Sequence, residues 1–587
     1  MSITTPVAPS SAAAGANAAL DDAAKAALDA DIATLTAAEK DWANLSITGR
    51  ADLLQAVHDS VAAVAGDWVS AATQFKSLDP SSQSVGEEWQ SGPYGVLASC
   101  NLLVTSLRSI AKGVSPIAKA KIGSAPGNRT TVRVLPSSAI EGILFHGYDA
   151  EVWLQPGITA DAAKAAAGLG ELTPTQTHGV GVVLGAGNIT SIPPLDVIYE
   201  IFANNRLVLL KLNPVMSNME SVYSRALKPV IDAGFLRIVQ GGGEAGSYLV
   251  HHKNISHVHI TGSAATHDVI VWGPGKDGAD RKAKNTPLLK KEITSELGGV
   301  SPIIVVPGKW SAADLKFQAE HVASMRLHNG GYNCIAGQIV VLSSDWAQRE
   351  AFLDQLRSAM NRTPDRTPWY PGSDSRVAAA ASAYPQAEKV GPNGTRLLID
   401  IKADEDASTL TTTECFSPVL GVVEVAGSGQ AFLDTAVATV NTEFLGTLGA
   451  NVIIDPSTKK SLGAGFRNAM AELRYGTITV NAWTGFSFLA AGAPWGAFPG
   501  HDLQDVQSGI GVVHNSMLIA STEKTILTGA FRPFPRSIAG GEFSLFPKAP
   551  YFVTSRSSVS TGKALVNFAT KPSWLRLPAV FLQAFKA

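Results

Sequence analysis

Short apolar runs alternate with amphipathic segments along the middle of the chain, from about residue 179 to about residue 273. Because the short runs are almost continuously apolar, they predict a parallel sheet that helices cover on both faces. Such sheets bind ligands at the carboxyl ends of their strands, so the pattern points to a nucleotide or a similar ligand. The predicted strands are "GVGVVLGAG" (179–187), "RLVLLKLN" (206–213), "FLRIVQ" (235–240) and "ISHVHITG" (255–262). The predicted helices are "PLDVIYEIFANN" (194–205), "SNMESVYSRALKPVIDAG" (217–234), "EAGSYLVHH" (244–252) and "SAATHDVIVWG" (263–273).

Other patterns flank this region. Apolar residues at three-and-four spacing predict helices over 19–74, where one face would carry Leu53, Leu54, Val57, Val61 and Val64. The β-formers of 131–156 predict two or three strands. A second α/β region follows over 301–508, with strands such as "PIIVV" (302–306) and helices such as "WAQREAFLDQLRSAM" (346–360). Residues 1–18 are interpreted as a loose arm, and the pattern assigns no role to the last segment, from about 530 to 587.

Composition narrows the class of protein. Hydrophobic residues make up 45% and charged residues 16% of the 587 positions, which is typical of a globular protein with a large core. The net charge of −2 and the absence of clustered Lys and Arg argue against a nucleic-acid partner. Three cysteines indicate a reducing compartment rather than a disulfide framework. Without a signal-like start or a long apolar run, we expect a soluble cytoplasmic protein and no membrane partner.

One of the three cysteines has unusual neighbours. Cys334 lies in "RLHNGGYNCIAGQ" (326–338), among Asn and Gly residues and between two apolar runs. A cysteine kept for packing is usually surrounded by apolar side chains, whereas a thiolate nucleophile needs room for a reactant. A lone cysteine is more often inert, so this stretch alone leaves both interpretations open.

Two glycine-containing turns follow predicted strands. Gly241, Gly243 and Gly246 match G-x-G-x-x-G between a strand and a helix, a pattern that can turn backbone amides toward phosphate. In a chain with 54 glycines the match is equally well explained as a flexible turn. Thr261, Gly262 and Ser263 end the next strand, where Ser263 would cap a helix or meet a phosphate.

Three polar residues also stand at strand positions that suit a ligand. Glu296, in "EITSELGGVSP" (292–302), is a candidate base or an ordinary ion-pair partner. Asn188 follows a buried strand, where it would turn the chain or direct an amide into a cleft. Lys211 ends the next strand and would be solvated surface or a ligand for ribose or phosphate.

Taken in order, these stretches resemble the NAD(P)-dependent aldehyde dehydrogenase superfamily. The likeness runs from about residue 35 to about residue 530, and the succession of motifs is far more specific than any one of them. The segments that carry it are "GAGN" with Lys211, "GGGEAG", "ITGS", "SELGG", "NGGYNC", "ECFSPVL" (414–420), "VNTEFLGTLGANVI", "YGTITVN" and "SGIG".

The resemblance implies a reaction and roles for the polar residues. Cys334 would attack an aldehyde carbonyl, Asn188 and the Cys334 amide would hold the oxyanion, and Glu296 would activate water to release a carboxylic acid. The implied cofactor is NAD or NADP, with no metal, and the small-molecule partner is an aldehyde. By similarity, Lys211 and Glu414 would bind the two riboses, Ser263 the pyrophosphate, and Phe416 would pack beside the nicotinamide ring.

The implied fold is α/β, with a Rossmann-type cofactor domain, an α/β catalytic domain and a β-strand flap for a homodimer or homotetramer. The expected ranges are 1–18 for the arm, 19–130 and 158–300 for the cofactor domain, 131–157 and 522–531 for the flap, 301–510 for the catalytic domain and 532–587 for an extension of unknown role.

Departures from the family pattern concern the substrate and cofactor. Gly187 stands where many relatives have Trp, which predicts a wider pocket beside Asn188, and Tyr332 replaces a Gln. Pro214 stands where NAD-preferring relatives often have Glu, so NAD and NADP remain alternatives. An enzyme that transfers the acyl group to CoA and a non-catalytic nucleotide-binding relative are the competing hypotheses; Glu296 favours release to water.

Overall fold

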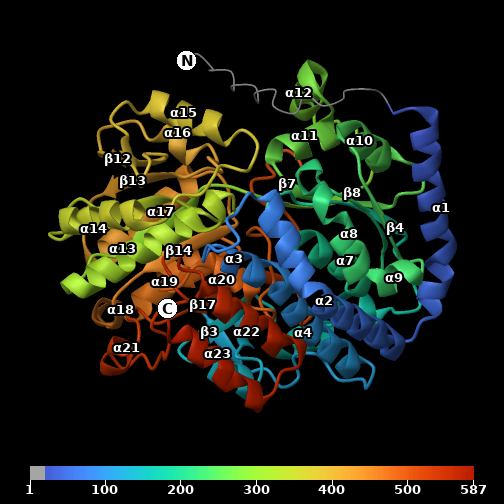
Figure 1. Ribbon diagram of the computed structural model, residues 1–587, viewed down its shortest axis with the longest axis horizontal. Helices are drawn as coiled ribbons and strands as arrows, with labels where there is room; N and C mark the ends of the chain where they lie inside the picture. The colour runs from blue at the N-terminus through green and yellow to red at the C-terminus, as the bar shows by residue number, and fades with distance from the viewer. Residues whose placement is uncertain (1–19) are drawn as a thin grey trace.

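The computed structural model describes residues 20–587, so the predicted arm over 1–18 lies outside the described residues. Its strands form two sheets that lie in different halves of the molecule (Figure 1). The smaller sheet has six strands and the larger has eleven.

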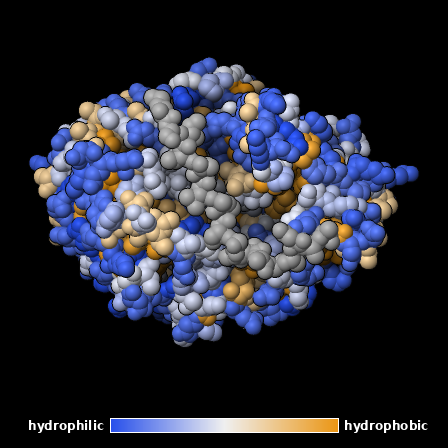
Figure 2. All heavy atoms as spheres, turned by 90° about the horizontal axis from the view of Figure 1, so that it is seen from above, coloured by the Kyte–Doolittle hydropathy of each residue, from blue (hydrophilic) through white to orange (hydrophobic). Residues whose placement is uncertain are grey.

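On the face seen in Figure 2, hydrophilic residues predominate and hydrophobic ones are scattered among them. No described helix is long and apolar enough to cross a membrane.

The six-stranded sheet confirms the predicted parallel arrangement. Its order is β16-β8-β7-β4-β5-β6, and every pair is parallel except β16 with β8. The register aligns Leu184, Lys211 and Val239 at one edge, so the carboxyl ends of these strands meet there. The strands are β4 (Val180–Leu184), β5 (Leu207–Lys211), β6 (Leu236–Val239), β7 (His257–Gly262), β8 (Glu292–Leu297) and β16 (Gly509–Ile510).

Helices cover this sheet at the predicted places, with one correction. The single helix expected over 217–234 is a 3-10 turn, Pro214–Met219, followed by two short helices, α8 (Glu220–Ala226) and α9 (Lys228–Asp232). Pro229 explains the break, because proline has no amide hydrogen and its ring collides with the carbonyl of the preceding turn. The other helices of this half are α6 (Ala160–Ala166), α7 (Ile192–Phe202), α10 (Gly243–His251), α11 (Ala264–Trp272) and α12 (Gly275–Ala283), with a 3-10 turn at Leu169–Leu172.

The eleven-stranded sheet joins the second α/β region to the 131–156 segment. Its order is β1-β2-β3-β17-β15-β14-β9-β10-β13-β12-β11, with parallel pairing from β17 to β12. Its central strands are β9 (Ser301–Val305), β10 (Gly337–Ser343), β12 (Arg396–Ile401), β13 (Val419–Val425), β14 (Gly449–Ile453), β15 (Thr477–Val480) and β17 (Thr522–Thr528), with β11 (Glu388–Val390) at one edge. Its helices are α13 (Ala312–Leu327), α14 (Arg349–Arg362), α15 (Ser373–Ala383), α16 (Ser408–Thr411), α17 (Gly429–Glu443), α18 (Pro456–Leu462), α19 (Ala464–Glu472) and α20 (Thr484–Leu489).

The 131–156 segment forms the other edge of this sheet. It contributes β2 (Arg129–Leu135) and β3 (Asp149–Leu154), with the helix α5 (Ala139–Leu144) between them and β1 (Ile122–Ala125) before them. The pairs β1–β2, β2–β3 and β3–β17 are antiparallel. Ser138 begins α5 by accepting a hydrogen bond from the Glu141 amide, so the middle of the segment is helical where a third strand was an option.

Long N-terminal helices pack on the six-stranded half. They are α1 (Asp22–Asn44) and α2 (Ile47–Phe75), followed by α3 (Val85–Trp89), a π-helical turn at Gln90–Tyr94 and α4 (Gly95–Ile110). On α2, Leu54, Val57, Val61 and Val64 are buried as predicted, while Leu53 is half-buried.

The C-terminal extension is folded against these helices. It comprises α21 (Arg536–Ala539), α22 (Ser558–Thr570), a 3-10 turn at Trp574–Arg576 and α23 (Leu577–Ala584). α22 contacts α3 and α4, and α23 packs against α22; Figure 1 shows α22 next to α4 and α23 next to α22. A Cβ on Gly86 would lie 2.2 Å from Ser558 Oγ, and one on Gly562 2.7 Å from Trp89 Cβ, so glycines allow α3 and α22 to touch.

Candidate active site

The loop that carries Cys334 is a run of left-handed turns between α13 and β10. Asn329, Gly330 and Gly331 have φ of 54°, 70° and 84°, the region that Gly and Asn tolerate best. At Gly331 a Cβ would also lie 3.0 Å from the Ser417 carbonyl oxygen. The "NGG" run therefore makes a tight turn, after which the half-buried Cys334 reaches the middle of the molecule.

Cys334 lines two cavities at once. The first, the strand-end cavity, has a volume of about 460 Å³ and lies at the carboxyl ends of β4, β5 and β7. The second, the apolar cavity, has a volume of about 80 Å³ and is walled mainly by aromatic and aliphatic side chains. A thiol at this junction is accessible from both sides.

Glu296 is the acidic partner of Cys334. It lies on β8, where Trp495 Nε1 donates a 3.0 Å hydrogen bond to its Oε1. Burial, with a smaller contribution from Asp196, raises the pKa of Glu296 to about 7 although hydrogen bonds from Trp495 and Cys334 oppose the shift. Burial first, and then the negative charges of Glu296 and Glu414, raise the pKa of the Cys334 thiol well above its usual value. The raised pKa of the thiol means that its neutral form is favoured at neutral pH in this environment.

Asn188 is tied to the cysteine loop. Its Nδ2 donates to the Tyr332 carbonyl oxygen at 3.0 Å, and its own carbonyl accepts a 3.3 Å hydrogen bond from Asn329 Nδ2. One amide hydrogen of Asn188 is used in this way, and the second is available to a ligand. The expected extra width at Gly187 is taken up, because a Cβ there would lie 2.8 Å from Asn213 Cγ.

A buried ion-pair network supports the same loop from behind and was missed by sequence reasoning. Lys76 Nζ lies 2.9 Å from Glu88 Oε2 and donates to Asn329 Oδ1 at 3.2 Å. Glu87 accepts a 2.9 Å hydrogen bond from the Asn329 amide and pairs with Arg366. The only sequence signal is a lone "EE" in a short helix, which resembles a solvated face.

The strand-end cavity gathers most of the predicted cofactor residues. Lys211, Gly243, Gly246, Gly262 and Ser263 line it. Burial lowers the pKa of Lys211, an effect that the nearby Glu244 opposes. Ser263 is exposed and caps α11, accepting a 3.2 Å hydrogen bond from the Thr266 amide.

Two residues predicted to bind the cofactor lie near this cavity but have other structural roles. Gly241, with φ of 137°, shapes the turn before α10, where a Cβ would lie only 2.6 Å from Ala245 Cβ. Thr261 borders the cavity, but its hydroxyl donates a 2.9 Å hydrogen bond to Asp196 Oδ2.

Glu414 and Phe416 complete the other wall of the strand-end cavity. The Oε1 atom of Glu414 is buried and has no hydrogen-bond partner among the described residues. Burial raises the pKa of Glu414 to about 8, against the opposing charge of Arg326. A Cβ on Gly298 would lie 2.0 Å from that oxygen, so this glycine makes room for the carboxyl group. Phe416 has φ of 40°, and its ring centroid lies 4.8 Å from that of Tyr370.

A histidine cluster adjoins Glu296 and was also missed. His259 Nε2 and His514 Nε2 lie 3.6 Å and 3.3 Å from the carboxylate of Asp196, which is fully buried on α7. Although burial alone would raise it, the pKa of Asp196 is lowered to about 2 by these imidazoles. The alternating "HVHIT" of β7 is the signal that could have located the cluster, because alternate residues of a strand share one face.

Solved structures share this architecture. The aldehyde dehydrogenase KauB of Pseudomonas aeruginosa superposes with a TM-score of 0.56 at 18% identity, covering 86% of this chain and 88% of its own. The Mycobacterium tuberculosis aldehyde dehydrogenase complexed with NAD+ gives a TM-score of 0.55 at 16% identity, with 85% and 89% covered. The fold class is therefore that of the aldehyde dehydrogenases.

Sequence comparison gives the same family. Residues 162–389 match the model of the aldehyde dehydrogenase family. The N-succinylglutamate 5-semialdehyde dehydrogenase 1 of Caulobacter vibrioides is 26% identical over 283 residues, which is 45% of this chain and 54% of that protein. An aldehyde dehydrogenase of Enchytraeus buchholzi is 32% identical over 136 residues, 23% of each chain. The matches thus span about half the length of these curated relatives or less. Residues 162–389 are thus similar in sequence to the aldehyde dehydrogenase family, and the fold of most of the chain is that of its solved members.

Proposed function

We propose that this protein oxidises an aldehyde to a carboxylic acid through a thioester on Cys334, with NAD or NADP as the oxidant. The observation that carries the proposal is the position of Cys334 between the two cavities, together with the buried Glu296 that lines the same strand-end cavity and whose pKa is raised to about 7. A carboxylate with a pKa near the working pH is well suited to general-base catalysis.

The residues of the strand-end cavity fit a dinucleotide. Lys211 would bind the adenosine ribose, Ser263 and the amides at the start of α11 the pyrophosphate, and Glu414 the nicotinamide ribose. The buried, unpartnered Oε1 of Glu414 supports this fit, since a ribose hydroxyl would give it a donor. When bound, the nicotinamide ring accepts a hydride from the substrate carbon.

The first covalent step would use three groups of this chain. The proton of the Cys334 thiol passes to water, and the sulfur forms a bond to the aldehyde carbon. The second amide hydrogen of Asn188 and the backbone amide of Cys334 then hold the oxygen that becomes negative. A donor of this kind contributes about 3 kcal/mol to the transition state.

Glu296 would act when the acid is released. After oxidation the acyl group is held on Cys334 as a thioester, and Glu296 removes a proton from the water that attacks it. The carbon–sulfur bond breaks, the acid leaves and the thiol is restored. Because the base must be ionised, the rate of this step should rise with pH through about 7.

Assembly and location are further parts of the proposal. We propose that β1, β2, β3 and β17 form an oligomerisation flap, since β1 ends the large sheet with an unpaired edge. A homodimer or homotetramer in the cytoplasm would follow, and the three free cysteines are compatible with a reducing compartment.

The test is the formation of reduced cofactor with a panel of aliphatic and aromatic aldehydes, with NAD and NADP separately and with and without CoA. Wild type, Cys334→Ser and the control Cys100→Ala, which removes a buried thiol on α4, would be compared. Turnover without CoA that is lost only in Cys334→Ser supports the proposal. Turnover that requires CoA would move the protein to the acylating enzymes, and cofactor binding without turnover would favour a non-catalytic relative.

A further inference from the structure

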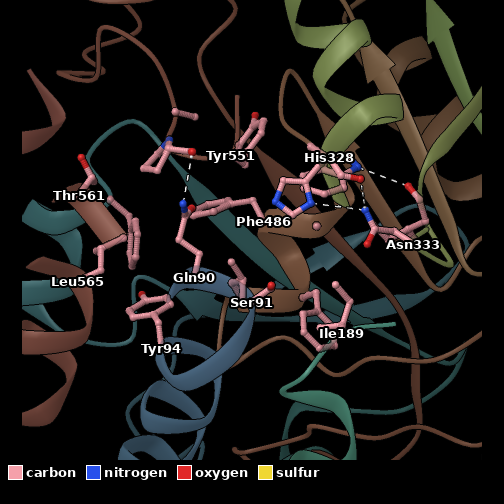
Figure 3. A pocket seen from close by; sticks show the side chains of 18 of the residues that line it. Gln90, Ser91, Tyr94, Ile189, His328, Asn333, Phe486, Tyr551, Thr561 and Leu565 are labelled. Atoms are coloured by element: carbon pink, nitrogen blue, oxygen red, sulfur yellow. Dashed lines mark hydrogen bonds between the residues drawn. The ribbon is translucent and has the colours of Figure 1, made fainter. Parts of the chain in front are cut away.

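The apolar cavity extends from Cys334 to the C-terminal extension. Figure 3 shows Thr561 and Leu565 at one end and Asn333, the neighbour of Cys334, at the other. Val580 on α23 and Tyr551 complete the wall that the extension contributes. The exposed fractions of Thr561, Leu565 and Val580 are 1%, 6% and 1%, so this end of the cavity is closed.

Several polar groups around the cavity already have hydrogen-bond partners within the protein. Gln90 Nε2 donates to the carbonyls of Gly86 and Pro550, at 3.0 and 3.3 Å (Figure 3 shows the bond to Pro550). Ser91 Oγ donates to the Glu87 carbonyl at 2.8 Å, and Asn333 Nδ2 to the His328 carbonyl at 2.9 Å. The lining is mostly aromatic and aliphatic, so a charged tail would lose water here with little compensation.

The extension is held firmly enough to act as a wall. Asn101 Nδ2 donates to the Ala569 carbonyl at 2.6 Å, and His58 Nε2 lies 3.2 Å from the same oxygen. The rings of Phe546 and Phe581 stack with centroids 5.8 Å apart. Together with the close crossing of α3 and α22, the contacts of Ala569 hold α22 on the body of the protein, and the Phe546–Phe581 stack ties α23 to the rest of the extension.

From these observations we propose that the C-terminal extension sets the length of the aldehyde that the protein accepts. Leu565 and Val580 stop the substrate tail at the end distant from Cys334, and the substrate class is aldehydes with a short, unbranched apolar tail. The volume of about 80 Å³ is smaller than the roughly 150 Å³ of an engineered cavity that holds benzene. This proposal rests on the proposed function, because it assigns the substrate class of the same site.

The test compares straight-chain aldehydes from propanal to dodecanal in wild type, Leu565→Ala and Val580→Ala. We expect wild type to favour the short members. In each variant, kcat/KM for decanal relative to butanal should rise by roughly tenfold, because space for buried methylenes is gained. The matched control is Leu582→Ala, the same substitution at a side chain of α23 that is 64% exposed, which should leave the profile unchanged.

A second measurement separates this proposal from the proposed function. Straight-chain primary alcohols cannot form the thioester, so their protection of Cys334 against an alkylating reagent reports occupancy of the cavity alone. We expect protection to fall off beyond a certain length in wild type and to extend to longer alcohols in Leu565→Ala. If protection shifts in this way but the protein turns over no aldehyde, the role of the C-terminal extension as a wall is supported and the proposed aldehyde oxidation is rejected. A wild type that prefers dodecanal, or folded variants with the wild-type profile in both assays, would overturn the proposal.

Discussion

The strand-end cavity and the apolar cavity meet at Cys334 but are built differently. The first is made from residues at strand ends and turns, where Gly243, Gly262 and Gly298 leave space and Lys211 and Glu414 offer charge. The second is made from side chains of segments far apart in the chain, such as Tyr94, Phe486 and Leu565. Both cavities need distant segments to pack, but the residues of the strand-end cavity stand in short motifs that the sequence displays, whereas those of the apolar cavity look like ordinary core residues.

The largest expected effect on activity comes from substitution of Cys334, where the two cavities meet. Cys334→Ser should lower kcat by at least about a thousandfold, because a serine hydroxyl is a far weaker nucleophile than a thiolate. Cofactor affinity should stay within about twofold, since the sulfur is a minor part of the strand-end cavity. Steady-state kinetics and titration of cofactor binding check both statements. A large loss of cofactor binding would mean that the two cavities are not independent.

Glu296→Gln should give the next largest effect. Loss of the general base should lower the rate of acid release by about a hundredfold or more. In wild type, kcat should rise with pH through about 7, where Glu296 becomes ionised, and this limb should be absent from the variant. In Glu296→Gln, pre-steady-state kinetics should show a burst of reduced cofactor followed by a slow phase. An unchanged pH profile would assign the base to another group.

Glu88→Gln tests whether the buried Lys76–Glu88 ion pair stabilises the loop that carries Cys334. The substitution leaves the buried Lys76 without its carboxylate, and the free energy of unfolding should fall by about 3 kcal/mol. Asp232→Asn is the control, because it breaks the exposed pair Lys228–Asp232 and should cost less than about 0.5 kcal/mol. Denaturant unfolding measures both values. Equal losses would show that the buried pair has no special role in holding the cysteine loop.

Lys211→Met should have the smallest effect and should be confined to the strand-end cavity. Removal of one charged donor should weaken cofactor binding by about tenfold. The length profile of aldehydes should not change, because Lys211 is not part of the apolar cavity wall. Cofactor titration and the aldehyde panel together provide the check. A changed aldehyde profile would indicate that the two cavities communicate.

The sequence was informative where structure depends on neighbouring residues. Apolar runs located four strands of the six-stranded sheet, and the glycine turns and Lys211 were singled out because they follow strands, whereas Glu414 was singled out only through the family resemblance. Pro229 could have divided the helix predicted over 217–234, since the effect of proline on a helix is local.

The sequence was silent where structure depends on tertiary contacts. Asp196 and His514 are more than three hundred residues apart and look like unremarkable positions until α7 and the 514 region meet around His259. Likewise, no periodicity links Lys76 and Glu88 to Asn329. The role of the extension was also unpredictable, because it depends on which segment α22 packs against.

The hydrogen bond from Asn101 to Ala569 joins positions 468 residues apart. A chain that emerges from the ribosome in order would complete the nucleophile loop and both sheets before α22 exists. Until then, the hydrocarbon that later lines the apolar cavity faces water, and any aldehyde could reach Cys334. The last helices to be synthesised therefore close the apolar cavity, while Cys334 stays open to the strand-end cavity.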